Sequence, residues 1–323
     1  MVGRVGASHR RKPVNKKPKI VITNQEQTPV PQTAARSRFF ATPGRRLKLT
    51  KRDIQVLLFI YKHGLARRDQ LQELFGFGET PSYVNGRLRL YYDAGLVDRT
   101  FDLNAPHGTQ AVYWIARGGV RLVARWTGFD LKAIRSHVDR HAAFSDHTLE
   151  VVDFRVHLGR ALAAQADWKL DLWLAESECI HQYEVLEPGG GWRTRVMRPD
   201  AFFRIRQAGG SPDAPAFKSF FLEIDRSGTG HSRIILKFRI HADYLATGLF
   251  RETYGTGSFN TLVVTTSDTR RDNLVQALRE QGSDLMWVTT REAILALGVL
   301  GRIWHAPAKP SPVALTETAI GGG

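Results

Sequence analysis

Two runs of aromatic and branched residues on either side of a glycine- and proline-rich break constrain the fold of this chain most strongly. The runs cover residues 201–205 and 217–225, and the break covers residues 209–215. Such runs around a turn-forming segment are typical of a β-hairpin. Because side chains alternate between the two faces of a strand, we expect Glu223 and Asp225 on one face and Ile224 on the other.

Three carboxylates are expected to meet at one end of this hairpin. If the chain folds back near residue 212, Asp200 lies across from residues 223–225, within the roughly 4.5–8 Å over which cross-strand neighbours interact. Clustered carboxylates repel one another and raise each other's pKa unless a cation lies among them. Mg²⁺ prefers oxygen ligands, and beside a phosphodiester it can generate hydroxide and neutralise developing charge. Asp200, Glu223 and Asp225 therefore predict a metal site.

Helices and a hairpin are predicted between residues 50 and 126. Thr50 is a candidate N-cap with Asp53 in the fourth place, and Gly64 is a candidate helix stop. Thr80 and Pro81 are favoured at a helix start. The expected elements are helices at 50–63, 68–75 and 82–93, a hairpin wing around 99–101 and 111–115, and a closing helix at 117–126. This order predicts a winged helix-turn-helix.

The third of these helices carries the residues predicted to bind DNA. Its apolar positions face the core, which leaves polar and basic side chains accessible to solvent, and such residues contact phosphates and base edges in the major groove. The predicted DNA-binding residues are Ser82, Tyr83, Asn85, Arg87, Arg89 and, from the wing, Arg99. A winged helix used for protein contacts or dimerisation is the alternative. The wing and the third helix favour duplex DNA over RNA.

The motif of Pro199-Asp200 followed by Glu223-Ile224-Asp225 resembles the PD-(D/E)XK nuclease-like core. Together with the winged helix, it makes residues 47–305 resemble the replication-relaxation family of plasmids and mobile elements. The resemblance implies that Asp200 and Glu223 bind Mg²⁺ and that a lysine stands two positions after Glu223. Asp225 occupies that position instead. Relatives that carry the lysine on the following helix nominate Lys237, and others have lost catalysis and only bind.

The charge of the chain points to a polyanionic partner. The 46 Lys and Arg residues against 31 Asp and Glu give a net charge of +15. Residues 1–48 hold twelve of these bases and one acid, so they carry +11 and the remainder +4. Residues 1–46 lack a helical apolar period and are expected to form a disordered basic arm that adds salt-dependent attraction to phosphates. The single cysteine, Cys179, excludes an internal disulfide.

We expect an α+β or α/β architecture with a defined domain order. The expected parts are a disordered basic arm (1–46), a winged helix-turn-helix DNA-binding domain (47–127), a connector (128–145), a mixed-sheet PD-(D/E)XK nuclease-like domain (146–305) and a flexible tail (306–323). No apolar run approaches the roughly 18 residues of a membrane span and no signal peptide is recognisable, so a cytoplasmic location is expected.

Two functions remain open at this point. One is a DNA-binding protein that acts in the replication, relaxation or transfer of a plasmid or mobile element and is an Mg²⁺-dependent endodeoxyribonuclease. The other is a non-catalytic regulator or replication accessory with a degenerate nuclease-like domain. Double-stranded DNA is the expected partner in both cases, with a homodimer or a partner replication or transfer protein as a further expectation.

Overall fold

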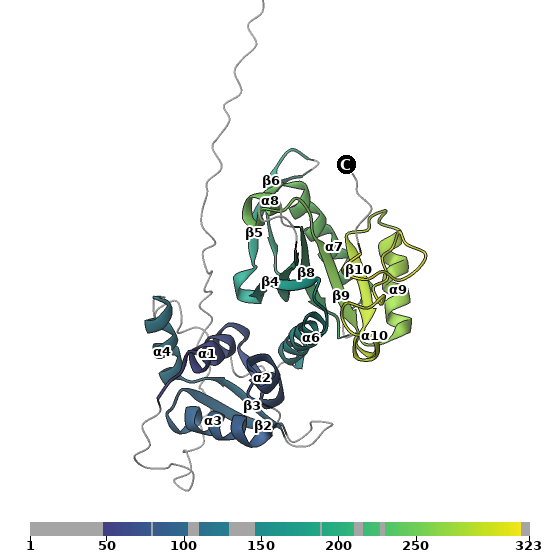
Figure 1. The fold of residues 1–323 in the computed structure, drawn as a ribbon. Coiled ribbons are helices and arrows are strands. Elements are labelled where there is room, and N and C mark those ends of the chain that lie inside the picture. Colours follow the sequence, from purple (N-terminus) through teal and green to yellow (C-terminus); the bar gives the residue numbers. More distant parts are fainter. Residues whose placement is uncertain are drawn as a thin grey trace, which may run out of the picture.

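The computed structural model of this chain describes residues 48–317, apart from residues 79, 103–109, 129–145, 188, 210–215 and 227–229. It shows a mixed α+β protein whose elements form two groups, here called the first unit (residues 51–127) and the second unit (residues 146–317) (Figure 1). The predicted basic arm and nearly all of the predicted connector lie outside the described residues.

The first unit places helices around a small antiparallel sheet in which the strand order is β1-β3-β2. Its elements are α1 (Lys51–His63), β1 (Leu65–Arg67), α2 (Arg68–Phe75), α3 (Pro81–Asp93), β2 (Val97–Asp102), β3 (Gln110–Ile115) and α4 (Arg117–Thr127). Val56, Leu57, Leu71 and Leu88 are among the buried side chains at the centre of this unit.

Local sequence signals account for the ends of α1. The Thr50 hydroxyl accepts a hydrogen bond from the Asp53 backbone N–H at 3.3 Å, and the Asp53 carboxylate accepts one from the Thr50 backbone N–H at 2.5 Å. This reciprocal pair is the predicted capping box. The helix ends at Gly64, whose φ of +85° is readily adopted only by glycine.

The second unit is built on a five-stranded mixed sheet in the order β10-β9-β8-β7-β4. Strands β4, β7 and β8 are antiparallel, whereas β8, β9 and β10 are parallel. The elements are α6 (Asp146–Ala163), β4 (Trp168–Ala175), β5 (His181–Leu186), β6 (Trp192–Met197), β7 (Ala201–Gln207), β8 (Phe217–Ile224), α7 (His231–Ala246), α8 (Leu249–Tyr254), β9 (Asn260–Thr265), α9 (Asp268–Arg279), β10 (Met286–Thr290) and α10 (Arg291–Leu297).

The β7–β8 hairpin confirms the predicted alternation of side chains. Phe220 and Leu222 pack on the face of the sheet that also contacts α6, whereas Phe221 packs on the opposite face with residues of α7 and α9. The register pairs Ala201 with Leu222, which places Asp200 next to Glu223. None of the described helices is long and apolar enough to cross a membrane.

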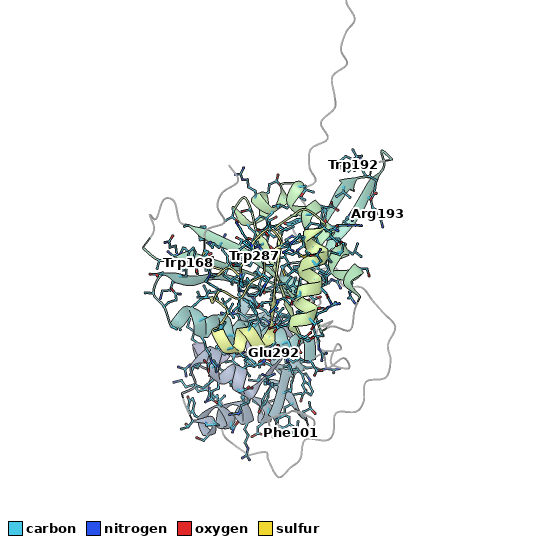
Figure 2. All side chains as sticks on the ribbon, turned by 90° about the vertical axis from the view of Figure 1, so that its right-hand side faces the viewer. Phe101, Trp168, Trp192, Arg193, Trp287 and Glu292 are labelled. Atoms are coloured by element: carbon cyan, nitrogen blue, oxygen red, sulfur yellow. The ribbon has the colours of Figure 1, made fainter. Side chains whose placement is uncertain are left out.

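Two parts of the second unit differ from expectation. Strands β5 and β6 form a separate hairpin that was not predicted, and Figure 2 shows it projecting from the body of the protein with Trp192 and Arg193 near its tip. The flexible tail expected from residue 306 is instead packed as far as residue 317. Val313 forms a β-bridge with Trp304, and Leu315 is fully buried in the core of the second unit. These apolar side chains hold the tail in place.

Helix α6 belongs to the second unit and also packs against α2 and β1 of the first unit. Gln70 Nε2 on α2 donates a hydrogen bond to the Leu149 carbonyl at 2.9 Å, and Arg67 pairs with Asp153 at 2.5 Å. Leu149 also packs with Leu65 of β1 and Val112 of β3. The first unit is therefore held against the second largely through this one helix.

Candidate functional site

A cavity of about 340 Å³ lies where β7 begins and β8 ends, beside α7. Its walls combine three acids (Glu176, Asp200, Glu223), three bases (Arg198, Arg233, Lys237), two histidines (His147, His241) and two apolar residues (Val196, Ile240). Three of the four predicted catalytic residues, Asp200, Glu223 and Lys237, are thus brought together.

The backbone pairing of β7 with β8 fixes the position of Asp200. The Asp200 N–H donates to the Leu222 carbonyl at 3.0 Å, which extends the ladder by one residue beyond β7. The Asp200 carboxylate then accepts a hydrogen bond from the Ile224 N–H at 2.7 Å. Because these contacts bridge the two strands, Asp200 and Glu223 line the same end of the sheet.

Glu223 is the most deeply buried acid of the cavity, with 1% of its surface exposed. Lys237 on α7 donates a hydrogen bond to Glu223 Oε2. Burial alone would lower the pKa of Lys237, but the negative charges of Glu223 and Asp200 outweigh burial and raise that pKa. Glu223 Oε1 accepts no hydrogen bond from the described residues and lies 3.3 Å from His241 Nε2.

Two histidines complete the site, and neither was predicted from the sequence. His147 on α6 lies 3.0 Å from Asp200 Oδ1, and the hydrogen bond to Asp200 raises the pKa of His147 despite burial. His241 follows Lys237 by one helical turn, and its Nδ1 lies 2.7 Å from the Thr261 hydroxyl. The spacing of His241 from Lys237 was the only available signal, because His147 reaches the cavity from a distant element.

Asp225 does not join the cluster, contrary to expectation. Its carboxylate is buried and pairs with Arg270 Nε at 2.9 Å, while the Thr265 hydroxyl donates a further hydrogen bond at 2.9 Å. Arg270 lies in the first turn of α9, which packs beside the end of β8 on the same face as Glu223. The predicted roles of Asp225 as a metal ligand and catalytic residue are therefore corrected.

Without Asp225, two carboxylates remain in the cavity as candidate metal ligands. Among the described residues there is no group of three or more His, Cys, Asp or Glu side chains that could enclose a metal. Mg²⁺, however, usually keeps several waters and is held by one or two carboxylates together with substrate phosphates. Asp200 and Glu223 are the two carboxylates that could hold such an ion, although in this structure they contact His147 and Lys237 respectively.

The predicted DNA-binding residues fall into two sets. Ser82, Tyr83, Asn85 and Arg89 lie on the exposed face of α3, and Tyr83 has 58% of its surface exposed. Arg99 on β2 is partly exposed and lies over the Tyr92 ring at 4.7 Å.

Arg87 is held inside the first unit instead. It donates to both carboxylate oxygens of Asp53 and to the Lys48 carbonyl. Asp53 is buried and also accepts a hydrogen bond from Tyr91. Burial would raise the pKa of Asp53, but hydrogen bonds from Arg87, Tyr91 and Thr50 hold that pKa well below its usual range. The prediction that Arg87 contacts DNA is corrected, because its guanidinium neutralises a buried acid.

The fold and the site thus define a mixed α+β protein with two carboxylates and a lysine converging at one end of its sheet. The replication-relaxation family matches residues 57–259, which is more than half of the chain and includes Asp200, Glu223 and Lys237. The chain belongs to the replication-relaxation family, as the sequence motifs predicted. Membership indicates a role in the replication or relaxation of a plasmid or mobile element. No curated protein and no solved structure matches the chain.

Proposed function

We propose that this protein binds double-stranded DNA during the replication or relaxation of its plasmid or mobile element. In this proposal residues 47–127 are a winged helix-turn-helix that holds the duplex. Residues 146–305 are a PD-(D/E)XK nuclease-like domain whose cavity receives a phosphodiester. The observation that carries the proposal is the exposed polar face of α3, the helix that precedes the β2–β3 hairpin.

The arrangement of the first unit supports this function. Helix α3 follows α2 closely in the sequence, and the β2–β3 hairpin follows α3, which is the order of a winged helix. Helix α3 buries Val84 and Leu88 and turns Ser82, Asn85 and Arg89 outward. Side chains of these types read base edges and contact phosphates when such a helix enters the major groove.

Binding to duplex DNA from the origin of the element tests the proposal. Replacing Asn85 with Ala is expected to weaken binding by about 1–3 kcal/mol, or roughly 5- to 150-fold, if Asn85 contacts a base. Fluorescence anisotropy measures the affinity, and Gln55→Ala on the exposed face of α1 is the matched control. Unchanged affinity in Asn85→Ala, or wild-type protein that does not bind the duplex, would contradict the proposal.

A second function, Mg²⁺-dependent nicking of DNA, is favoured by the convergence of Asp200, Glu223 and Lys237. When bound, the metal would supply an activated hydroxide and neutralise charge on the phosphate. Asp200 and Glu223 would hold it. The ammonium of Lys237, in contact with Glu223, would stabilise the charge that develops on the scissile phosphate.

Nicking of supercoiled DNA with Mg²⁺, Mn²⁺ or EDTA tests this second function. Metal-dependent nicking is expected in the wild type and in Asp225→Asn, and is expected to be lost in Asp200→Asn, Glu223→Gln and Lys237→Met. Melting temperatures identify variants that fail to fold. DNA binding without cleavage in any metal would leave a non-catalytic replication accessory as the function.

A further inference from the structure

Helix α4 carries three exposed arginines and no acidic residue. Arg117, Arg121 and Arg125 are each exposed, and none of them makes an ion pair, hydrogen bond or ring contact through its guanidinium with another described residue. Some arginines elsewhere are neutralised by buried acids, as Arg87 is by Asp53 and Arg270 by Asp225, whereas α4 itself offers its arginines no acidic partner. We call Arg117, Arg121 and Arg125 the α4 arginines.

The spacing of the α4 arginines places them in one line. Residues four apart lie on the same face of a helix. At a rise of about 1.5 Å per residue, the line from Arg117 to Arg125 is about 12 Å long. Each strand of duplex DNA presents a phosphate about every 3.4 Å along the axis, so a line of this length can reach three to four of them.

The start of α4 is fixed against the end of α3. The Ala116 N–H donates to the Leu96 carbonyl at 3.0 Å. A Cβ on Gly118 would lie 2.4 Å from the Gly95 carbonyl oxygen, and a Cβ on Gly119 would lie 2.1 Å from that of Leu96. Only glycine allows this approach, so the line of arginines begins beside the turn in which α3 ends.

We propose that the α4 arginines bind backbone phosphates of the duplex that α3 contacts, independently of base sequence. This inference rests on the proposed DNA-binding function and extends it to a second surface of the first unit. A guanidinium matches phosphate oxygens with two parallel hydrogen bonds. Each strand of duplex DNA presents a continuous line of negatively charged phosphates. Such a line matches a row of arginines without intervening acids better than an acidic protein segment does.

The salt dependence of binding tests this inference. The variant R117Q/R121Q/R125Q is compared with R206Q/R239Q/R251Q, which removes three exposed arginines without ion pairs among the described residues from the second unit. Affinity for the origin duplex and for an unrelated duplex is measured by anisotropy between about 50 and 200 mM salt. Each lost phosphate contact lowers the slope of log K against log salt by about 0.9.

The α4 variant is expected to lose about 2.7 of that slope and to weaken equally on both duplexes, while the control variant keeps the wild-type slope. An unchanged slope in the α4 variant, with Asn85→Ala still impaired, would overturn this inference alone. An equal loss in both triple variants would also overturn it, because net charge would then be the cause. Failure of the wild type to bind DNA would instead remove the proposed function.

Discussion

At the scale of single residues, Arg87 has the chemistry to bind DNA but serves to neutralise the buried Asp53. Arg87 was predicted to be accessible because it lies on a helix between exposed residues. Asp53 lies 34 positions earlier, and no local pattern links the two residues. Asp225 and Arg270 repeat this situation, because the partner of the acid comes from a helix that begins beyond the next strand. The sequence therefore identified the right kinds of residue at both places and could not determine their partners.

Replacing Asp53 with Asn is expected to destabilise the first unit by about 2–4 kcal/mol. The substitution leaves the partly buried Arg87 without its counterion, and the loss of one partner of a buried pair is strongly destabilising. Urea unfolding at neutral pH measures the change. Asp272→Asn is the control, because Asp272 pairs with Arg271 at an exposed position and is expected to change stability by less than about 1 kcal/mol.

The same residue predicts how stability depends on pH. The folded-state pKa of Asp53 is depressed, so its contribution is present above the unfolded-state pKa of about 3.9 and is lost as the pH falls below that value. Asp53→Asn should therefore remove part of the acid destabilisation of the wild type. An identical decline of stability in both proteins between about pH 5 and pH 3 would contradict this expectation.

At the scale of elements, helix caps and turns were predicted well because their signals are local. The capping box of α1, the stop at Gly64 and the β7–β8 hairpin each follow from a few adjacent residues. Strand β1 was missed because it has three residues, and the β5–β6 hairpin because polar residues interrupt its apolar pattern. The candidate site was predictable to the extent that it depends on one hairpin and the helix after it, which contribute Asp200, Glu223 and Lys237.

Two glycines of the first unit are expected to respond in opposite directions to replacement with alanine. Gly119→Ala should cost about 1–3 kcal/mol, because the new Cβ would overlap a backbone oxygen and force α4 away from the end of α3. Gly86→Ala, within α3, should stabilise by about 0.5–1 kcal/mol, because no atom lies within 4 Å of the new Cβ and alanine is the better helix former. Chemical denaturation of both variants measures these changes.

At the scale of the whole molecule, His63 lies where the two units meet. Its ring packs against Phe59 of α1 and lies 6.2 Å from the Trp173 ring of β4. Burial, followed by the positive charges of Arg155 and Lys62, lowers the pKa of His63 to about 3. Protonation of this ring is therefore disfavoured in the folded protein.

Stability is accordingly expected to fall as the pH decreases from about 6.5 towards 3, because the unfolded chain binds a proton at His63 that the folded chain does not. At pH 5 the loss should be roughly 1–2 kcal/mol relative to neutral pH. Thermal unfolding of the wild type and His63→Phe at pH 7.5 and pH 5 measures it. A pH-dependent loss of the same size in the variant would assign the effect to other groups.

Because of Leu149, the first unit depends on a helix of the second unit to complete its packing. Its side chain belongs to a helix of the second unit, yet it covers Leu65 and Val112 of the first. A fragment that ends before residue 146 would expose those two side chains to water and would lose the hydrogen bond from Gln70 to the Leu149 carbonyl. Any transplant of the first unit into another protein should consequently include α6. The packed core of the first unit extends beyond residue 127 and includes part of this helix.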